Sequence, residues 1–218
     1  MPTPSRPSPT RRLLLSAALA GAIAGGAWPA LAARRKVVTL LGDSITAGYG
    51  LPAAAALPVR LQAALARIGT QAVVRGAGVS GDTTAGGLAR LDFSVQADTD
   101  VCVVAFGGND LLQGLDPRTT RANLTAIVRR LKARRIAVVV AGIAAPAAIG
   151  AAYARDFNAV FGAVARAERV ALDPDLLAGV AGRPALNQRD GIHPNAAGVV
   201  IIAARLAPVV ARALKARR

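Results

Sequence analysis

Hydrophobic and polar positions follow a repeating pattern from residue 36 to the end of the chain. Continuous apolar runs, typical of strands buried on both faces, alternate with stretches that repeat an apolar residue every three or four positions, as amphipathic helices do. Strands are predicted at 37–41, 71–75, 101–106, 136–143 and 170–172. Helices are predicted at 53–68, 83–91, 118–134, 151–167 and 195–214. This alternation predicts an α/β protein with a parallel sheet between two layers of helices.

The predicted elements fit a three-layer α/β/α domain with a flavodoxin-like five-stranded parallel sheet in the order 2-1-3-4-5. In that order the first three strands are neighbours, so the loops that follow them open into one crevice at the carboxyl edge of the sheet. No internal repeat or linker interrupts residues 33–218. We therefore expect one domain over this range.

Residues 1–32 have a different composition. Their basic residues, which no acidic residue accompanies, are Arg6, Arg11 and Arg12. An apolar stretch from 13 to 27 follows, and the segment ends in Ala30-Leu31-Ala32. This order is typical of a secretory signal peptide cleaved after Ala32, and the adjacent arginines also fit a twin-arginine signal. The apolar stretch is short for a membrane span. We expect an exported protein, periplasmic or secreted.

The chain is strongly basic, with a formal net charge of +15. The predicted signal holds three of the 27 basic residues and none of the 12 acids, so its removal leaves +12. The arginines are scattered along the predicted helices, and aromatic residues make up 3% of the chain. This favours a solvated basic surface over a nucleic-acid site, for which clustered charge and stacking aromatics are typical. The surface suits weak association with an anionic membrane or envelope, and we expect no nucleic-acid partner.

Cysteine and histidine are too few for most metal sites. Cys102 is the single cysteine and His193 the single histidine, so no intramolecular disulfide can form and zinc lacks its usual ligands. We expect neither a metal nor a cofactor.

Candidate catalytic residues follow the predicted strands. Ser44 comes directly after the first strand, and Asp190 precedes His193 by three residues near the end of the chain. A serine, a histidine and a carboxylate are the parts of a nucleophilic triad, in which the imidazole accepts the proton of an otherwise unreactive hydroxyl. The length of the segment between the fifth strand and Asp190 permits all three to meet at one edge.

Four blocks in order resemble those of the SGNH, or GDSL, hydrolases. They are Gly42-Asp43-Ser44, Gly81, Gly107-Gly108-Asn109-Asp110 and Asp190-Gly191-Ile192-His193. Within this family, the blocks are most similar to those of the secreted arylesterase, thioesterase I and lysophospholipase branch. The resemblance implies the SGNH hydrolase fold and a serine esterase acting on carboxylic esters, thioesters or lysophospholipids through an acyl-enzyme.

The resemblance also implies individual roles. Ser44 would be the nucleophile, His193 the base and Asp190 the carboxylate that orients the imidazole. The oxyanion hole would consist of the backbone N–H groups of Ser44 and Gly81 and the side-chain amide of Asn109. We interpret two further acids, Asp43 and Asp110, as structural residues that bind backbone N–H groups in their loops.

Two positions depart from the branch. Gly76 stands where an asparagine is common, which bears on the rigidity of the loop that follows. The loop at 144–150 is almost entirely small and apolar. Small side chains offer little apolar area to a long acyl chain. We therefore expect an open crevice that prefers short acyl groups, from acetyl to about octanoyl.

Three alternatives compete with the esterase interpretation. A carbohydrate O-acetyl esterase would use the same four blocks, although few aromatics are present to stack on sugars. A dinucleotide-binding protein is suggested by Gly76-Ala77-Gly78-Val79-Ser80-Gly81 with Asp98 or Asp100 as the ribose-binding acid, but the motif follows the second strand rather than the first. A non-catalytic binding module would leave the complete triad unexplained.

Overall fold

Five parallel strands form the central sheet, in the order β2-β1-β3-β4-β5. The strands are β1 (Lys36–Gly42), β2 (Ala72–Gly78), β3 (Val101–Ala105), β4 (Ala137–Ala141) and β5 (Ala171–Asp173). Every residue of β3 is buried, as is β1 beyond its first residue, in keeping with their continuous apolar runs. The predicted strand order is confirmed.

The structure is a computed structural model that describes residues 1–3 and 34–216. Residues from Arg35 onward form one compact unit. The predicted signal peptide and its cleavage site after Ala32 lie outside the described residues, apart from the first three residues.

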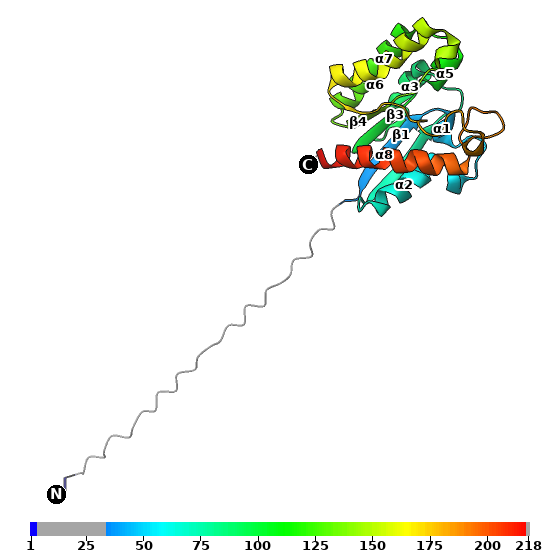
Figure 1. Cartoon of the computed structure of the whole chain (residues 1–218). Helices are drawn as coiled ribbons and strands as arrows, with labels where there is room; N and C mark the ends of the chain where they lie inside the picture. The colour runs from blue at the N-terminus through cyan, green and yellow to red at the C-terminus, as the bar shows by residue number, and fades with distance from the viewer. Residues whose placement is uncertain (4–33, 217–218) are drawn as a thin grey trace. The chain divides into compact units, whose positions relative to one another are not determined.

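Helices cover both faces of the sheet, which gives the three predicted layers (Figure 1). One layer contains α2 (Leu57–Arg67) and α8 (Ala196–Ala216), which pack against each other. The other contains α3 (Thr84–Ala89), α6 (Pro117–Ala133) and α7 (Ala151–Glu168). Shorter elements join them: α1 (Ser44–Ala47), α4 (Leu91–Ser94), α5 (Gly108–Leu112) and the 3₁₀ turns η1 (Ala53–Ala55), η2 (Ala147–Ile149) and η3 (Pro184–Leu186).

Helix α8 is long and apolar because it belongs to the core. Among the described helices it alone has the length and composition of a membrane span. Its apolar residues Ile202, Leu206 and Val210 are fully buried in the same cluster as the strands. The pattern therefore reflects packing against the sheet and α2.

Strand β2 continues to Gly78, three residues beyond its predicted end, because Gly76 and Gly78 pair with β1. A Cβ at Gly76 would lie 2.8 Å from the Pro58 ring, so the glycine allows α2 to pack closely on β2. The first two glycines of the suggested dinucleotide motif thus belong to a strand rather than to a phosphate-binding turn.

The two acids that might have bound a ribose have structural roles. Asp98 forms an ion pair with Arg75 at 2.6 Å. Asp100 is buried, and its Oδ2 accepts a hydrogen bond from the Val37 N–H at 2.8 Å. The dinucleotide-binding interpretation is therefore wrong.

Candidate active site

The end of β1 places Ser44 at the edge of the sheet. The Asp43 side chain caps helix α1 by accepting a hydrogen bond from the Ile45 N–H at 3.0 Å. This cap starts the helix one residue after the strand and places Ser44 in its first turn, lining a cavity. A four-residue helix is too short to produce a hydrophobic period, so the sequence pattern does not predict it.

His193 and Asp190 belong to the segment that follows β5, the strand at one edge of the sheet, and this segment returns to Ser44 at the end of β1. His193 Nε2 lies 2.9 Å from Ser44 Oγ, and Nδ1 lies 2.6 Å from Asp190 Oδ2. The other Asp190 oxygen accepts the backbone N–H groups of Ile192 at 2.9 Å and His193 at 3.0 Å. The structure thus brings together the three residues of the predicted triad, although 149 positions separate Ser44 from His193.

The hydrogen bonds to Asp190 determine its charge. Those from the backbone N–H of His193, from its ring and from the backbone N–H of Ile192 lower the pKa of Asp190 to about 2. The carboxylate is therefore ionised at neutral pH. An ionised carboxylate on Nδ1–H leaves Nε2 free to accept a proton from the hydroxyl.

Gly81 and Asn109 lie beside Ser44 on the wall of the same cavity. Gly81 has a φ of +87°, a conformation that glycine adopts without strain, and a Cβ there would meet no atom within 4 Å. The backbone angle, rather than crowding within the protein, accounts for the glycine. Asn109 Nδ2 donates one hydrogen bond to the Asp82 carbonyl at 2.8 Å, which orients the amide from the loop that carries Gly81.

Arg90 joins the ends of β1 and β2 to this loop. Its guanidinium donates to the Gly42 carbonyl at 2.8 Å and to the Ala77 carbonyl at 2.9 Å, and it pairs with the Asp82 carboxylate at 2.5 Å. Sequence reasoning did not identify this role for Arg90. The network holds the loop that contains Gly81 against the strand that presents the serine.

Asp110 links elements rather than acting on a ligand. One of its oxygens accepts the Thr84 N–H at 2.9 Å and the other accepts the Thr120 hydroxyl at 3.1 Å. It is fully buried and lies outside the cavity lining. It therefore binds a backbone N–H, as expected, but in α3 rather than in its own loop.

Tyr49 is a neighbour of His193 that sequence reasoning missed. The two ring centroids lie 4.7 Å apart. The Gln188 side chain donates to the Tyr49 carbonyl at 2.8 Å and to the Pro194 carbonyl at 3.0 Å, which ties the segment after α1 to the histidine loop. The only sequence signal was an aromatic residue close to Ser44 in a chain with few aromatics.

A cavity of about 430 Å³ opens at Ser44, a size typical of small-molecule sites. Its apolar lining includes Leu111, Leu112, Ile143, Leu177 and Ile192. The loop at 144–150, on which the open-crevice prediction was based, contributes only Ala144 and Pro146. Apolar area therefore comes mainly from α5 and from the segment after β5.

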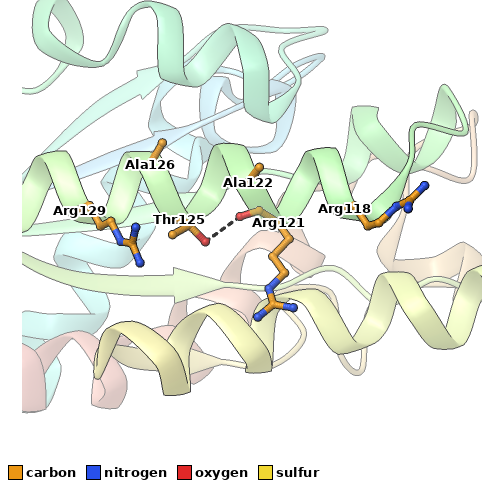
Figure 2. Close-up of a pocket in the computed structure, with 6 residues that line it drawn as sticks. All are labelled: Arg118, Arg121, Ala122, Thr125, Ala126 and Arg129. Atoms are coloured by element: carbon orange, nitrogen blue, oxygen red, sulfur yellow. Dashed lines mark hydrogen bonds between the residues drawn. The ribbon is translucent and has the colours of Figure 1, made fainter.

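A larger hollow of about 620 Å³ lies elsewhere, along the outer side of α6 (Figure 2). Its lining consists of Arg118, Arg121, Ala122, Thr125, Ala126 and Arg129. Figure 2 shows the Thr125 hydroxyl bonded to the Arg121 carbonyl within the helix, at 2.8 Å. The lining holds no histidine, cysteine or carboxylate, so this surface lacks the groups of a catalytic site.

The site combines a serine, a histidine and a carboxylate at the carboxyl edge of a parallel α/β sheet, and an apolar cavity lies beside the serine. This arrangement is typical of a hydrolase that uses a serine nucleophile. The chain belongs to the GDSL-like Lipase/Acylhydrolase family, whose model matches residues 40–201. It is accordingly a carboxylic ester hydrolase with the SGNH hydrolase fold.

Named relatives agree with this assignment. The chain is 39% identical to Esterase TesA of Pseudomonas aeruginosa over 74% of its own length and 81% of the relative's. It is 36% identical to thioesterase 1/protease 1/lysophospholipase L1 of Escherichia coli K12, over 75% of its own length and 78% of the relative's. The crystal structure of AlinE4, an SGNH-hydrolase family esterase, superposes with a TM-score of 0.69 at 40% identity, over 83% of this chain and 97% of that one.

Proposed function

We propose that this chain hydrolyses carboxylic esters through a Ser44–His193–Asp190 triad and an acyl-enzyme. The observation that carries the proposal is the continuous line of hydrogen bonds from Ser44 Oγ to Nε2 at 2.9 Å and from Nδ1 to Asp190 at 2.6 Å. Such a line lets one side chain accept the proton of the nucleophile while a carboxylate stabilises the imidazolium that forms.

In this mechanism Ser44 Oγ attacks the carbonyl carbon of the ester as His193 Nε2 takes its proton. Negative charge moves to the carbonyl oxygen, which the N–H groups of Ser44 and Gly81 and the second amide hydrogen of Asn109 stabilise. The C–O bond to the alcohol then breaks, and Nε2 returns the proton to the departing oxygen. A water molecule, deprotonated by the same nitrogen, then attacks the acyl carbon. The bond from this carbon to Ser44 Oγ breaks, Nε2 returns the proton to Oγ, and the acid leaves.

The cavity supports esters with short to medium acyl chains. Its leucine and isoleucine side chains offer apolar contact, and each additional buried CH₂ contributes about 0.8 kcal/mol. A cavity of about 430 Å³ holds such a chain without a tunnel through the core. We infer that the preference lies between acetyl and about octanoyl, with tolerance for the alcohol. The relatives' names extend the candidate substrates to aryl esters, thioesters and lysophospholipids.

We also infer that the enzyme acts outside the cytoplasm. The arginine-rich start, the apolar stretch and Ala30-Leu31-Ala32 support export. Sequencing the N-terminus of protein recovered from the periplasm or medium would test this, and an intact Met1 in recovered protein would contradict it.

Fluorophosphonate labelling tests the catalytic assignment. The probe is expected to modify Ser44, and Ser44→Ala is expected to abolish both labelling and ester hydrolysis, because no other hydroxyl among the described residues forms a hydrogen bond with the imidazole. Thr125→Ala, on the outer face of α6, is the control and should keep both. Circular dichroism would verify that the variants fold. Labelling that survives in Ser44→Ala would contradict the triad.

A nitrophenyl ester series tests the acyl preference. The value of kcat/KM is expected to peak at or below octanoyl, and a steep increase to palmitoyl would show that the cavity accommodates long chains. Acetylated sugars tested in parallel examine the O-acetyl esterase alternative. Preference for them over simple aryl esters would favour that alternative.

A further inference from the structure

A second hollow adjoins the cavity of Ser44 on the side of the histidine loop. It has a volume of about 400 Å³ and is lined by Gly182, Arg183, Pro184, Asn187, Gln188, Arg189 and Gly191. Gly191, two residues before His193, lines both spaces. The two spaces differ in character, because leucine and isoleucine line the first whereas polar side chains and two arginines line the second.

Two arginines, Arg183 and Arg189, line this hollow. Arg183 and Arg189 are both exposed, and within residues 34–216 neither side chain has a hydrogen-bond or ion-pair partner. Other arginines near the site are engaged, such as Arg90 with Asp82. The nearest carboxylate in sequence, Asp190, already accepts three hydrogen bonds from the histidine segment.

Catalytic geometry determines which part of a substrate would reach these arginines. In the mechanism proposed above, His193 Nε2 must return its proton to the departing alcohol oxygen, so the alcohol part lies beside the imidazole. The second hollow is formed by residues 182–191 of the segment leading to that imidazole. The acyl part, in contrast, occupies the apolar cavity next to Gly81 and Asn109.

We propose that Arg183 and Arg189 form a subsite for an anionic group, a phosphate or sulfonate, carried by the alcohol part of the ester. The proposal rests on the proposed function, because the triad defines the alcohol side. Guanidinium groups bind phosphate oxygens through charge-assisted hydrogen bonds, and the two here have no competing carboxylate partner in the described structure. The strongly basic chain adds long-range attraction for such substrates.

Two esters that differ only in the phosphate test the subsite: 1-butanoylglycerol 3-phosphate and 1-butanoylglycerol. Both are short enough to remain monomeric, so a lipid surface plays no part. The wild-type enzyme is expected to prefer the phosphate ester in kcat/KM. Arg183→Gln with Arg189→Gln is expected to reduce that preference on the order of tenfold, mainly through KM, since the contact is made equally in the ground and transition states.

Matched variants separate the subsite from general charge. Arg183→Lys should retain most of the preference. Arg121→Gln, which removes one charge from α6 as Arg183→Gln does from the hollow, should leave it unchanged. Inorganic phosphate, added at constant ionic strength, should raise KM for the phosphate ester in the wild type and much less in Arg183→Gln.

Three results would overturn the subsite: no preference in the wild type, a preference that survives in the double variant, or an equal loss in Arg121→Gln. Hydrolysis of 1-butanoylglycerol distinguishes failure of the subsite from failure of the proposed function. If the wild type cleaves this neutral ester without preferring its phosphate, the subsite alone is wrong. If Ser44→Ala cleaves it as well as the wild type, the triad is wrong.

Discussion

Asp43 makes the stability of this protein depend on pH in an unusual direction. Its side chain is 3% exposed, and this burial raises the pKa of the carboxyl to about 6 from an ordinary 3.8, despite the hydrogen bond from the Ile45 N–H and the nearby His193. The folded state therefore keeps this proton at pH values where the unfolded chain has lost it. Burial disfavours the charged form because water no longer solvates it.

The sign and size of the effect follow from this pKa difference. Stabilisation from the protonated group is complete below pH 3.8 and is lost as pH rises through 6, since the folded state binds the additional proton. A shift of about two pKa units corresponds to about 3 kcal/mol of unfolding free energy. At neutral pH the buried Asp43 charge therefore lowers the stability of the fold, while the same side chain caps the helix that positions Ser44.

Asp43→Asn isolates this contribution. The amide has the same shape, and its oxygen can still accept the Ile45 N–H, but it cannot ionise. We expect the variant to gain stability relative to the wild type by about 3 kcal/mol between pH 3.5 and 7. Urea denaturation of both proteins across this range measures the difference.

Asp156→Asn is the matched control. Asp156 lies on α7, and its side chain is 61% exposed, so its replacement should change the free energy of unfolding little at any pH. A difference between Asp43→Asn and the wild type that stays constant with pH, or that grows in the acid direction, would refute the reasoning. In that case the burial of the Asp43 carboxyl would not control its ionisation.

Three further predictions follow from the same contacts. Asn109→Ala is expected to lower kcat about 10²-fold with little change in KM, because its amide acts on charge that develops during attack; a change confined to KM would contradict this role. His193→Ala is expected to abolish ester hydrolysis, because the imidazole that lies 2.9 Å from Ser44 Oγ is the group that accepts its proton; turnover close to that of the wild type would contradict the triad. Gly87→Ala should destabilise the fold by about 1–3 kcal/mol, since its Cβ would lie 2.3 Å from the buried Phe106 ring. Gly162→Ala should not destabilise the fold, because a Cβ at Gly162 would meet only the flexible side chain of an arginine on α7. Thermal unfolding distinguishes the two variants.

The sequence by itself determined the architecture of this protein. Buried parallel strands need apolar residues on both faces, so they appear as continuous runs, and the covering helices repeat an apolar residue every three or four positions. This physical link explains why the five strands were predicted correctly, whereas their order was taken from the flavodoxin-like fold that the elements fit. It also explains why the candidate residues could be assigned to strand ends, since a parallel sheet brings its carboxyl ends to one edge.

Local geometry near the site was decided by contacts between distant segments. Helices α1 and α5 are too short for periodicity, and the Asp43 cap and the left-handed Gly107, with a φ of +119°, start them. The open crevice was predicted from the small residues at 144–150, and this basis was incomplete, because Leu111 and Leu177 reach the cavity from other elements. Which side chains converge on one space depends on packing, and no periodicity along the chain records it.

The triad shows most clearly which features the sequence identified and which the tertiary structure decided. Residue types and spacing identified Ser44, Asp190 and His193 as candidates, because few side chains can activate a hydroxyl. Their approach to within hydrogen-bonding distance across the sheet, however, depends on the path of residues 174–193. In that segment Asn187 donates to the Val180 carbonyl at 2.7 Å, and the Gln188 N–H donates to the His193 carbonyl at 2.8 Å. Those contacts exist only in the folded chain, and they place the imidazole over the serine.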